Sequence, residues 1–132
     1  MMTGIVVESV GVRAPGVVSA QTLKAEILAP GVYVHSSYIE NDCISVSEAR
    51  MLGAAVIACY VGGNHSTIEH NVSGILVPSD EPHTLASWIG ELYSDRELAK
   101  SIGIAGRVHA LGRHNPEMVE RQVLDAYNKA TH

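Results

Sequence analysis

Short runs of β-branched apolar residues alternate along this chain with longer segments whose apolar positions recur at helical spacing. Alternation of this kind predicts βα units and a mainly parallel sheet. The apolar runs predict four strands, at residues 5–7, 32–36, 54–60 and 75–77. The first strand is weak, whereas the third is expected to be the most deeply buried. The pattern therefore indicates an α/β fold.

Start and stop signals delimit the short helices that lie among these strands. A helix at residues 22–28 is expected to be capped near Ser19 and stopped by Pro30, because proline cannot continue a helix. Ser66 and Glu69 have the spacing of a capping box and predict a brief helix after the third strand. Each strand is thus expected to be followed by a helix, as in a parallel sheet.

The last third of the chain is predicted to be helical throughout. Its helix starts are indicated by Pro82 in a first turn, by Ser94 together with Glu97, and by Asn115 before Pro116. The expected helices are residues 82–93, 96–111 and 116–130. The predicted architecture is a partial Rossmann-like parallel sheet with a helical C-terminal tail.

Length and composition support one globular domain over residues 1–132. Hydrophobic residues make up 46% of the chain and charged residues 17%, which is typical of a folded protein rather than a disordered one. The net charge is −5, and the Lys and Arg residues are scattered. Because no basic stripe could neutralise a phosphate backbone, nucleic acid is excluded as a partner.

Cysteine usage and hydropathy point to the cytoplasm. Two cysteines, Cys43 and Cys59, are too few for a disulfide framework, so a reducing compartment is the simpler interpretation. No apolar run reaches the length that spans a bilayer. The N-terminus lacks the basic start and the sustained apolar region of a secretory signal.

The stretch SYIENDCISVSEA, residues 37–49, carries the most informative chemistry. It lies between a predicted strand end and a predicted helix at residues 45–53, which begins at the capping residue Ser45 and ends in a glycine. Ligands of open α/β sheets bind at the carboxyl ends of strands. Free backbone amides and the helix dipole make a helix start a phosphate site, and Cys43, Ile44 and Ser45 occupy that place.

Two acidic residues flank this turn, Glu40 on the loop and Glu48 in the first helical turn. Phosphate would repel a carboxylate, so the acids suit hydrogen bonds from sugar hydroxyls, as an acidic residue binds ribose in dinucleotide folds. A simpler alternative fits the spacing equally well. Ser45 and Glu48 form an S-x-x-E capping box, and Glu40 could be an ordinary solvated loop acid.

The chain resembles the C-terminal, nucleotide-sugar-binding domain of retaining glycosyltransferases of family 4. Their signature is two glutamates separated by seven residues, as Glu40 and Glu48 are here. The match continues through GAAVIACYVGGNHSTIEHNVSGILVPSDEPHTLASWI and through RHNPEMV, residues 113–119. It extends from about Gly16 to the C-terminus, which is most of the chain.

The resemblance implies a donor site with a role for each residue. Glu40 is implied as the catalytic-site residue that contacts hydroxyls of the transferred sugar, and Glu48 as the residue that binds ribose. Backbone amides near the sugar are implied for Asn41, Asp42 and Cys43. Backbone amides on the diphosphate are implied for Ile44 and Ser45. The loop with Gly62 and Gly63 is implied to shape the pocket wall.

The resemblance also implies the activity and its partners. The expected donor is a UDP- or GDP-sugar, transfer retains the anomeric configuration, and neither a metal nor another cofactor is required. The acceptor is unknown, with a saccharide or a lipid-linked molecule as the alternatives. A lipid-linked acceptor would place the protein at the inner face of the membrane, as a peripheral protein.

Several positions depart from the family pattern. Family members usually have Pro at the position of Ala55 and often at that of Ser36, and a small or apolar residue at that of Arg50. By the resemblance, this sequence is expected to lack the family's N-terminal acceptor domain and the first strands of the nucleotide domain, with the Arg and Lys that neutralise the diphosphate. Because that charge stabilises the leaving group, no turnover is expected from this chain alone.

The missing strands imply an unpaired edge on the strand at residues 32–36, since strand order in the resembling fold would leave it without its neighbour. Unpaired edges invite pairing with another chain. Residues 5–7 are expected to fill the gap, or else a second copy or a partner carrying the missing half covers it. The rival hypothesis is a non-enzymatic module that binds a nucleotide sugar weakly or serves only as an interaction domain.

The seven histidines are candidate metal ligands. Only His65 and His70 come near one another at helical spacing, and no third ligand accompanies them, so no metal is expected. The histidines are better interpreted as surface or helix-end residues. No His or Asp in the sequence frames Cys43 as a nucleophile, and Trp88 is expected to pack in the core.

Overall fold

A computed structural model describes residues 11–131 of the chain. The weak strand expected at residues 5–7 lies outside the described residues. Within them, three strands form one sheet in the order β1-β2-β3. They are β1 (Val32–His35), β2 (Ala55–Cys59) and β3 (Ile75–Val77), and both pairs are parallel. The prediction of three parallel, adjacent strands is confirmed.

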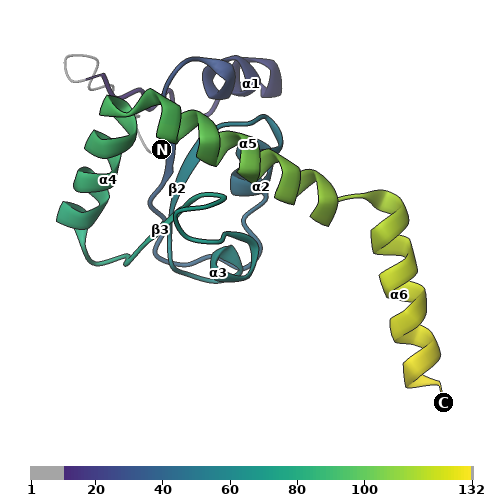
Figure 1. Ribbon diagram of the computed structural model, residues 1–132. Coiled ribbons are helices and arrows are strands. Elements are labelled where there is room, and N and C mark those ends of the chain that lie inside the picture. The colour runs from purple at the N-terminus through teal and green to yellow at the C-terminus, as the bar shows by residue number, and fades with distance from the viewer. Residues whose placement is uncertain (1–10, 132) are drawn as a thin grey trace.

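Six helices accompany this sheet in the described part of the chain. They are α1 (Ala20–Leu28), α2 (Ile44–Met51), α3 (Asn64–Thr67), α4 (Pro82–Ser94), α5 (Arg96–Arg113) and α6 (Pro116–Ala130). Helices α4 and α5 lie over one face of the sheet and α2 over the other (Figure 1). The chain is thus a three-layer α/β unit, as the alternating pattern predicts.

The central strand β2 is buried along its whole length and supplies both cores. Side chains alternate across a strand, so Ile57 and Cys59 face α4 and α5, whereas Val56 and Ala58 face α2. In register, Tyr33 of β1 lies beside Val56. Burial on both faces explains why this run is continuously apolar instead of alternating.

Several predicted caps are confirmed. Ser19 accepts a hydrogen bond from the backbone N–H of Thr22, and α1 ends before Pro30. Asn115 accepts from the N–H groups of Glu117 and Met118 at the start of α6. Side-chain oxygens of this kind satisfy amides that the helix itself cannot pair.

Three predicted caps are wrong because the helices begin elsewhere. The N-cap of α2 is Cys43, without a side-chain hydrogen bond, so Ser45 lies inside the first turn. Ser66 lies within α3, whose N-cap is Gly63. At α5 the capping oxygen belongs to Asp95, one residue after the expected Ser94, and it accepts from the N–H of Leu98.

The final helix leaves the body of the molecule. Figure 1 shows α6 projecting from the end of α5, and none of its residues is buried. Met118, Val123, Leu124 and Tyr127 are among its exposed apolar side chains. The expected helical tail is therefore present, but it packs little against the rest of the chain. None of the described helices combines the length and the hydrophobicity that crossing a membrane requires.

Candidate functional site

Two loops meet at the carboxyl ends of β1 and β2, at the bottom of Figure 1. The backbone N–H of Gly63 donates to the carbonyl of Asn41 at 2.6 Å. A Cβ on Gly62 would collide with the carbonyl of Glu40, and one on Gly63 would lie 2.8 Å from the Asn41 oxygen. Gly62 also has φ +52°, which side chains rarely adopt. The glycine pair is therefore pressed against the Glu40 loop.

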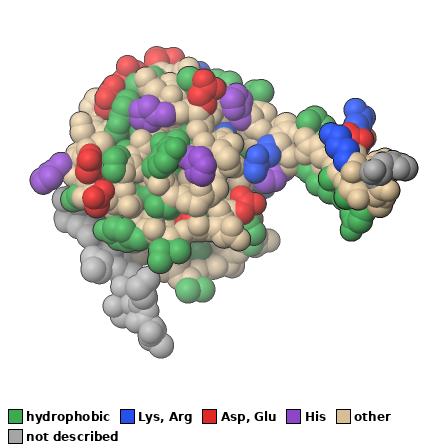
Figure 2. Space-filling view, turned by 90° about the horizontal axis from the view of Figure 1, so that it is seen from below, with side chains coloured by type: hydrophobic (Ala, Val, Ile, Leu, Met, Phe, Trp, Pro, Cys, Tyr) green, Lys and Arg blue, Asp and Glu red, His purple; other side chains and the backbone are tan. Residues whose placement is uncertain are grey.

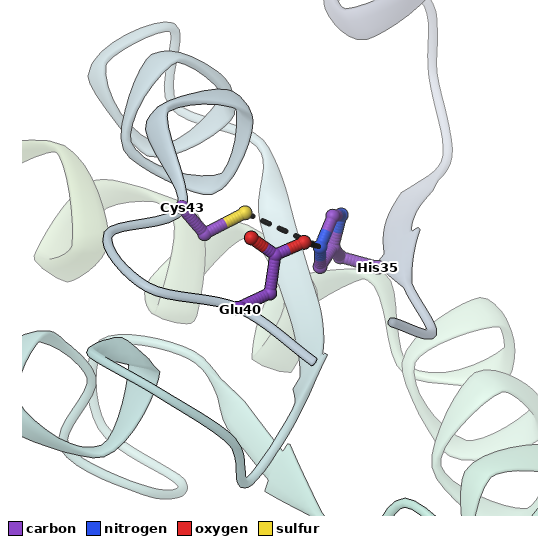
Figure 3. Close-up of side chains that lie close together, drawn as sticks. All are labelled: His35, Glu40 and Cys43. Atoms are coloured by element: carbon purple, nitrogen blue, oxygen red, sulfur yellow. Dashed lines mark hydrogen bonds and ion pairs between the residues drawn. The ribbon is translucent and has the colours of Figure 1, made fainter. Parts of the chain in front are cut away.

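The side chains of three residues converge beside these loops (Figure 3). His35, at the end of β1, donates from Nε2 to Glu40 Oε1 at 2.7 Å, and the same nitrogen lies 3.2 Å from Cys43 Sγ. Hydrogen bonds from His35 and then Ser37 hold the pKa of Glu40 below its usual value. Glu40 is therefore an ionised carboxylate that is already oriented by its neighbours.

The start of α2 presents unpaired backbone amides. No hydrogen bond from the amides of Ile44 or Ser45 is found among the described residues, as expected for the first turn of a helix. Ile44 is exposed, and the Ser45 hydroxyl lies 3.3 Å from Cys43 Sγ. The dipole of this eight-residue helix favours an anion at the same place.

Glu48 lies on the first turns of α2 and is exposed. Because Ser45 is not the N-cap, the alternative of a Ser45–Glu48 capping box is wrong. The Glu48 carboxylate has no hydrogen bond or ion pair among the described contacts of residues 11–131, and the backbone carbonyl of Glu48 is paired with the N–H of Leu52. Its carboxylate is therefore available to a ligand, and stability does not explain its position.

Asn41 and Asp42 complete the loop between Glu40 and the helix. Both are exposed. The carbonyl of Asn41 is held by the glycine loop, and the Asp42 carboxylate lies near Gly63 as well. The nine residues predicted for the site, from Glu40 to Gly63, thus lie around the edge of the sheet that the carboxyl ends of its strands form.

A hollow of about 420 Å³ opens at the same edge, beyond the end of β3. Its lining residues are Tyr60, Leu76, Val77, Pro78, Ser79 and Asp80. A second hollow of about 360 Å³ lies at the opposite, amino ends of the strands, around Gly31 and Gly53. None of the predicted site residues lines either hollow, but the first lies at the carboxyl ends of the strands, where the predicted site residues are, and the second at the opposite ends.

The face at the carboxyl ends of the strands carries mainly Asp, Glu and His among its ionisable side chains (Figure 2). Figure 2 views the molecule from below, toward the carboxyl ends of the strands, and shows Asp, Glu and His side chains spread over it, with few Lys or Arg on the globular part. The α2 residue Arg50 does not reach this face, because it is 1% exposed in the interior. The helix dipole and the free amides are therefore the main attraction for an anion here.

His35 is the site residue that the sequence interpretation missed. The sequence predicts a surface or helix-end histidine at this position, whereas His35 is a partly buried strand residue in contact with Glu40 and Cys43. Its place near the carboxyl end of the strand predicted at residues 32–36 was the available signal. His65 and His70 do not form a cluster: His65 bonds the carbonyl of Gly62, and His70 accepts from the amide of Leu76.

A family model described as glycosyl transferases group 1 matches residues 9–109. The chain belongs to this family. The match contains every residue of the edge described above and ends before α6. The group 1 assignment also agrees with the parallel α/β architecture.

Known proteins similar to this group 1 chain include a D-inositol 3-phosphate glycosyltransferase of Thermobifida fusca (strain YX). That protein is 30% identical over 104 residues, which cover 79% of this chain and 24% of the relative. The chain therefore spans about a quarter of the length of this curated relative.

Solved structures of other glycosyltransferases share the fold. Sucrose-phosphate synthase of Thermosynechococcus elongatus has a TM-score of 0.76 at 29% identity, covering 88% of this chain and 29% of that one. Anabaena HepE, solved in complex with UDP, has a TM-score of 0.72 at 24% identity, covering 79% of this chain and 29% of that one. Each likeness is confined to a minor part of the larger chain.

Proposed function

We propose that the edge formed by Glu40, the start of α2 and the glycine loop binds the donor of a retaining glycosyl transfer, a nucleoside diphosphate sugar. The observation that carries this proposal is the unpaired amides of Ile44 and Ser45 beside an oriented, ionised Glu40. Amides and a helix dipole suit a diphosphate, and a carboxylate suits sugar hydroxyls. In a group 1 glycosyltransferase, both belong to one ligand.

Each part of the donor has a matching group in this arrangement. The diphosphate lies on the amides of Ile44 and Ser45, and the transferred sugar lies toward Glu40. The ribose lies toward Glu48, whose carboxylate is exposed and unpaired among the described contacts. Asn41, Asp42 and Cys43 supply backbone near the sugar, and the glycine pair forms the wall behind them.

A UDP-sugar is the first choice of donor, with a GDP-sugar as the alternative. HepE, a neighbour in fold, was solved with UDP. The name of the Thermobifida relative specifies an inositol phosphate acceptor, which favours a small phosphorylated hydroxyl compound over nucleic acid or protein. The acceptor contacts are not among the residues of this edge.

Binding without turnover is the expected behaviour of the chain by itself. No Lys or Arg belongs to the proposed site, and stabilisation of a departing diphosphate is commonly the largest catalytic contribution. The amides of one helix start supply part of it. Cationic groups from elsewhere would have to complete the site before the glycosidic bond could form.

Isothermal titration of the full chain with UDP, UDP-glucose, UDP-N-acetylglucosamine, GDP and GDP-mannose tests the proposal. One nucleotide class should bind with a single site, and its sugar conjugate should bind more tightly than the diphosphate alone. Glu40→Gln should remove that difference, by about tenfold to a hundredfold, because bonds to a charged acceptor contribute about 1.5–3 kcal/mol.

Glu117→Gln is a matched control, since Glu117 is an exposed first-turn acid of α6, far along the chain from the site. It should bind every ligand as the unmodified chain does. Absence of binding by all five ligands would reject the donor site and favour an interaction module. Equal losses for diphosphate and sugar conjugate in Glu40→Gln would reject the role assigned to Glu40.

A further inference from the structure

Three side chains of the metal-ligating kind meet at the end of β1. An imidazole, a carboxylate and a thiol, from His35, Glu40 and Cys43, place one ligand atom each within 4.8 Å of one another. They come from a strand end, a loop and a helix N-cap. Figure 3 shows all three directed toward a common point. The proposed donor chemistry uses Glu40 alone among these side chains.

The separations suit a small tetrahedral ion after a minor adjustment. His35 Nε2 lies 2.7 Å from Glu40 Oε1 and 3.2 Å from Cys43 Sγ. Tetrahedral zinc with ordinary bond lengths separates a nitrogen from an oxygen ligand by about 3.4 Å and from a sulfur ligand by about 3.6 Å. Ion binding therefore requires the nitrogen–oxygen distance to lengthen by about 0.7 Å and the nitrogen–sulfur distance by about 0.4 Å.

The surroundings resemble those of a site with one open position. Cys43 is buried, and the side chains of His35 and Glu40 are 18% and 23% exposed. The cluster is therefore held from below and reachable from one side, where water or a ligand could take the fourth place. The Ser37 hydroxyl donates to the carbonyl of Ile39 at 2.9 Å, which steadies the loop that carries Glu40.

We propose that His35, Glu40 and Cys43 bind one zinc ion, or another thiophilic divalent cation of the same size. Thiolate and imidazole select such ions over magnesium or calcium, which prefer oxygen ligands. On binding, the Cys43 thiol becomes a thiolate ligand and its proton is released to solvent. The ion joins the end of β1 to the start of α2.

A bound ion also removes one sugar-binding group from the donor site. It occupies Glu40, the carboxylate that we assign to the sugar hydroxyls, so zinc and the sugar compete for one group. This consequence rests on the proposed function. The ion is then an inhibitor of donor binding and has no part in the transfer itself.

Titration of the metal-free full chain with Zn²⁺, and with Co²⁺ as a spectroscopic probe, tests the site without any nucleotide. One equivalent should bind, and cobalt should show a thiolate charge-transfer band together with the visible spectrum of a tetrahedral ion. Cys43→Ser should abolish that band. His35→Ala and Glu40→Gln should each weaken zinc binding by about a hundredfold, because each variant removes a ligand, and loss of a residue that only orients a ligand already costs about tenfold to a hundredfold.

Two control variants separate this site from other thiols and histidines. Cys59→Ala should keep the band, since Cys59 is buried in β2 on the other side of the strand from the α2 core. His83→Ala should bind zinc as tightly as the unmodified chain, since His83 is exposed at the start of α4. Serine is a good N-cap residue, so Cys43→Ser should still fold, which circular dichroism checks.

The results distinguish failure of the metal site from failure of the donor site. No zinc binding, or a cobalt band that survives Cys43→Ser, would overturn the proposed site. Zinc-loaded chain should bind the nucleotide sugar at least about tenfold more weakly, and unchanged affinity would overturn the competition. A metal-free chain that binds no nucleotide sugar but binds zinc at these residues would support the metal site and reject the donor site.

Discussion

The two ends of α2 differ in their exposure and in their hydrogen bonds. At its amino end, Ile44 is 70% exposed, its amide is unpaired among the described residues, and the capping residue Cys43 makes no capping bond. At its carboxyl end, Arg50 is 1% exposed, and Arg107 donates to the carbonyl of Met51 at 2.7 Å. One end is left open to a ligand, and the other end is closed by packing and a cation at the helix C-terminus.

The closed end contains the least expected residue of the helix. The Arg50 guanidinium donates to Ser73 Oγ at 3.4 Å, while its Nε has no partner among the described atoms. Burial first, and then the charge of Arg113, lowers the pKa of Arg50. No acid pairs with it among the described residues. Helix α2 is thus anchored by packing at its carboxyl end, even with one unpaired Arg50 nitrogen there, and keeps its unpaired backbone amides at the amino end, where they are open to a ligand.

The largest effect is expected for Gly62→Ala, which disturbs the glycine loop beside the amino end of α2. The new Cβ would meet the Glu40 carbonyl, and the backbone has φ +52°. We expect unfolding to become easier by at least about 2 kcal/mol, measured by chemical denaturation, and nucleotide-sugar binding to be lost.

Gly90→Ala is the matched control for that variant, because nothing lies within 4 Å of a Cβ at this position inside α4. It should leave binding intact and raise stability by about 0.5–1 kcal/mol. Equal behaviour of the two variants would show that the glycine loop does not define the open end.

At the closed end, Arg50→Met should raise the free energy of unfolding by about 2 kcal/mol, because it replaces an unpaired buried charge with an apolar side chain of similar length. Ser73 keeps a partner, since its hydroxyl also accepts from the amide of Glu69 at 3.0 Å. Thermal and denaturant unfolding measure the change. Ligand affinity should stay the same.

Arg50→Ala provides the contrast, with a loss of about 2–4 kcal/mol from the cavity that it leaves. If Arg50→Met were as destabilising as Arg50→Ala, the guanidinium itself would be stabilising the end of α2. The distinction between an open and a closed end would then need a different cause.

A smaller effect is expected at the open end for Glu48→Ala. Nucleotide-sugar affinity should fall about tenfold, or about 1.4 kcal/mol, while stability changes little, because the Glu48 side chain makes no capping bond and its backbone carbonyl stays in place in the variant. Calorimetry and denaturation measured on the same sample separate the two quantities. Glu120→Ala, an exposed acid of α6, should alter neither. A variant that loses stability but keeps affinity would make Glu48 a structural residue.

The smallest effect concerns the Glu40 carboxyl, which His35→Ala should return toward its usual pKa. The pKa is lowered in the folded chain, so Glu40 favours folding above its ordinary pKa, and that contribution disappears as pH falls through the lowered value. Carbon-detected NMR titration of the carboxyl measures it. An unchanged pKa in His35→Ala would mean that Ser37 alone orients Glu40.

The sequence by itself determined the order and kind of the described elements. Apolar runs of strand length and helical periods predicted β1 to β3 and the helices around them, because burial on one or two faces leaves a periodic mark on a chain. The open loop between Glu40 and Ser45 was also predictable, since ligands gather where parallel strands end. Helix starts were predicted less well, at α2, α3 and α5, because several nearby polar residues could each have served as the cap.

Only the tertiary structure decided which distant residues meet. His35 comes to Glu40 and Cys43 because the chain turns back at the end of β1, and Gly62 reaches the Glu40 backbone because β1 and β2 are neighbours in the sheet. Arg50 is buried because α5 covers that end of α2 with Gly106, which leaves room for the side chain. Contacts of this kind depend on packing between elements, which local periodicity does not encode, and they bring together His35, Glu40 and Cys43 and place the glycine pair against the Glu40 loop.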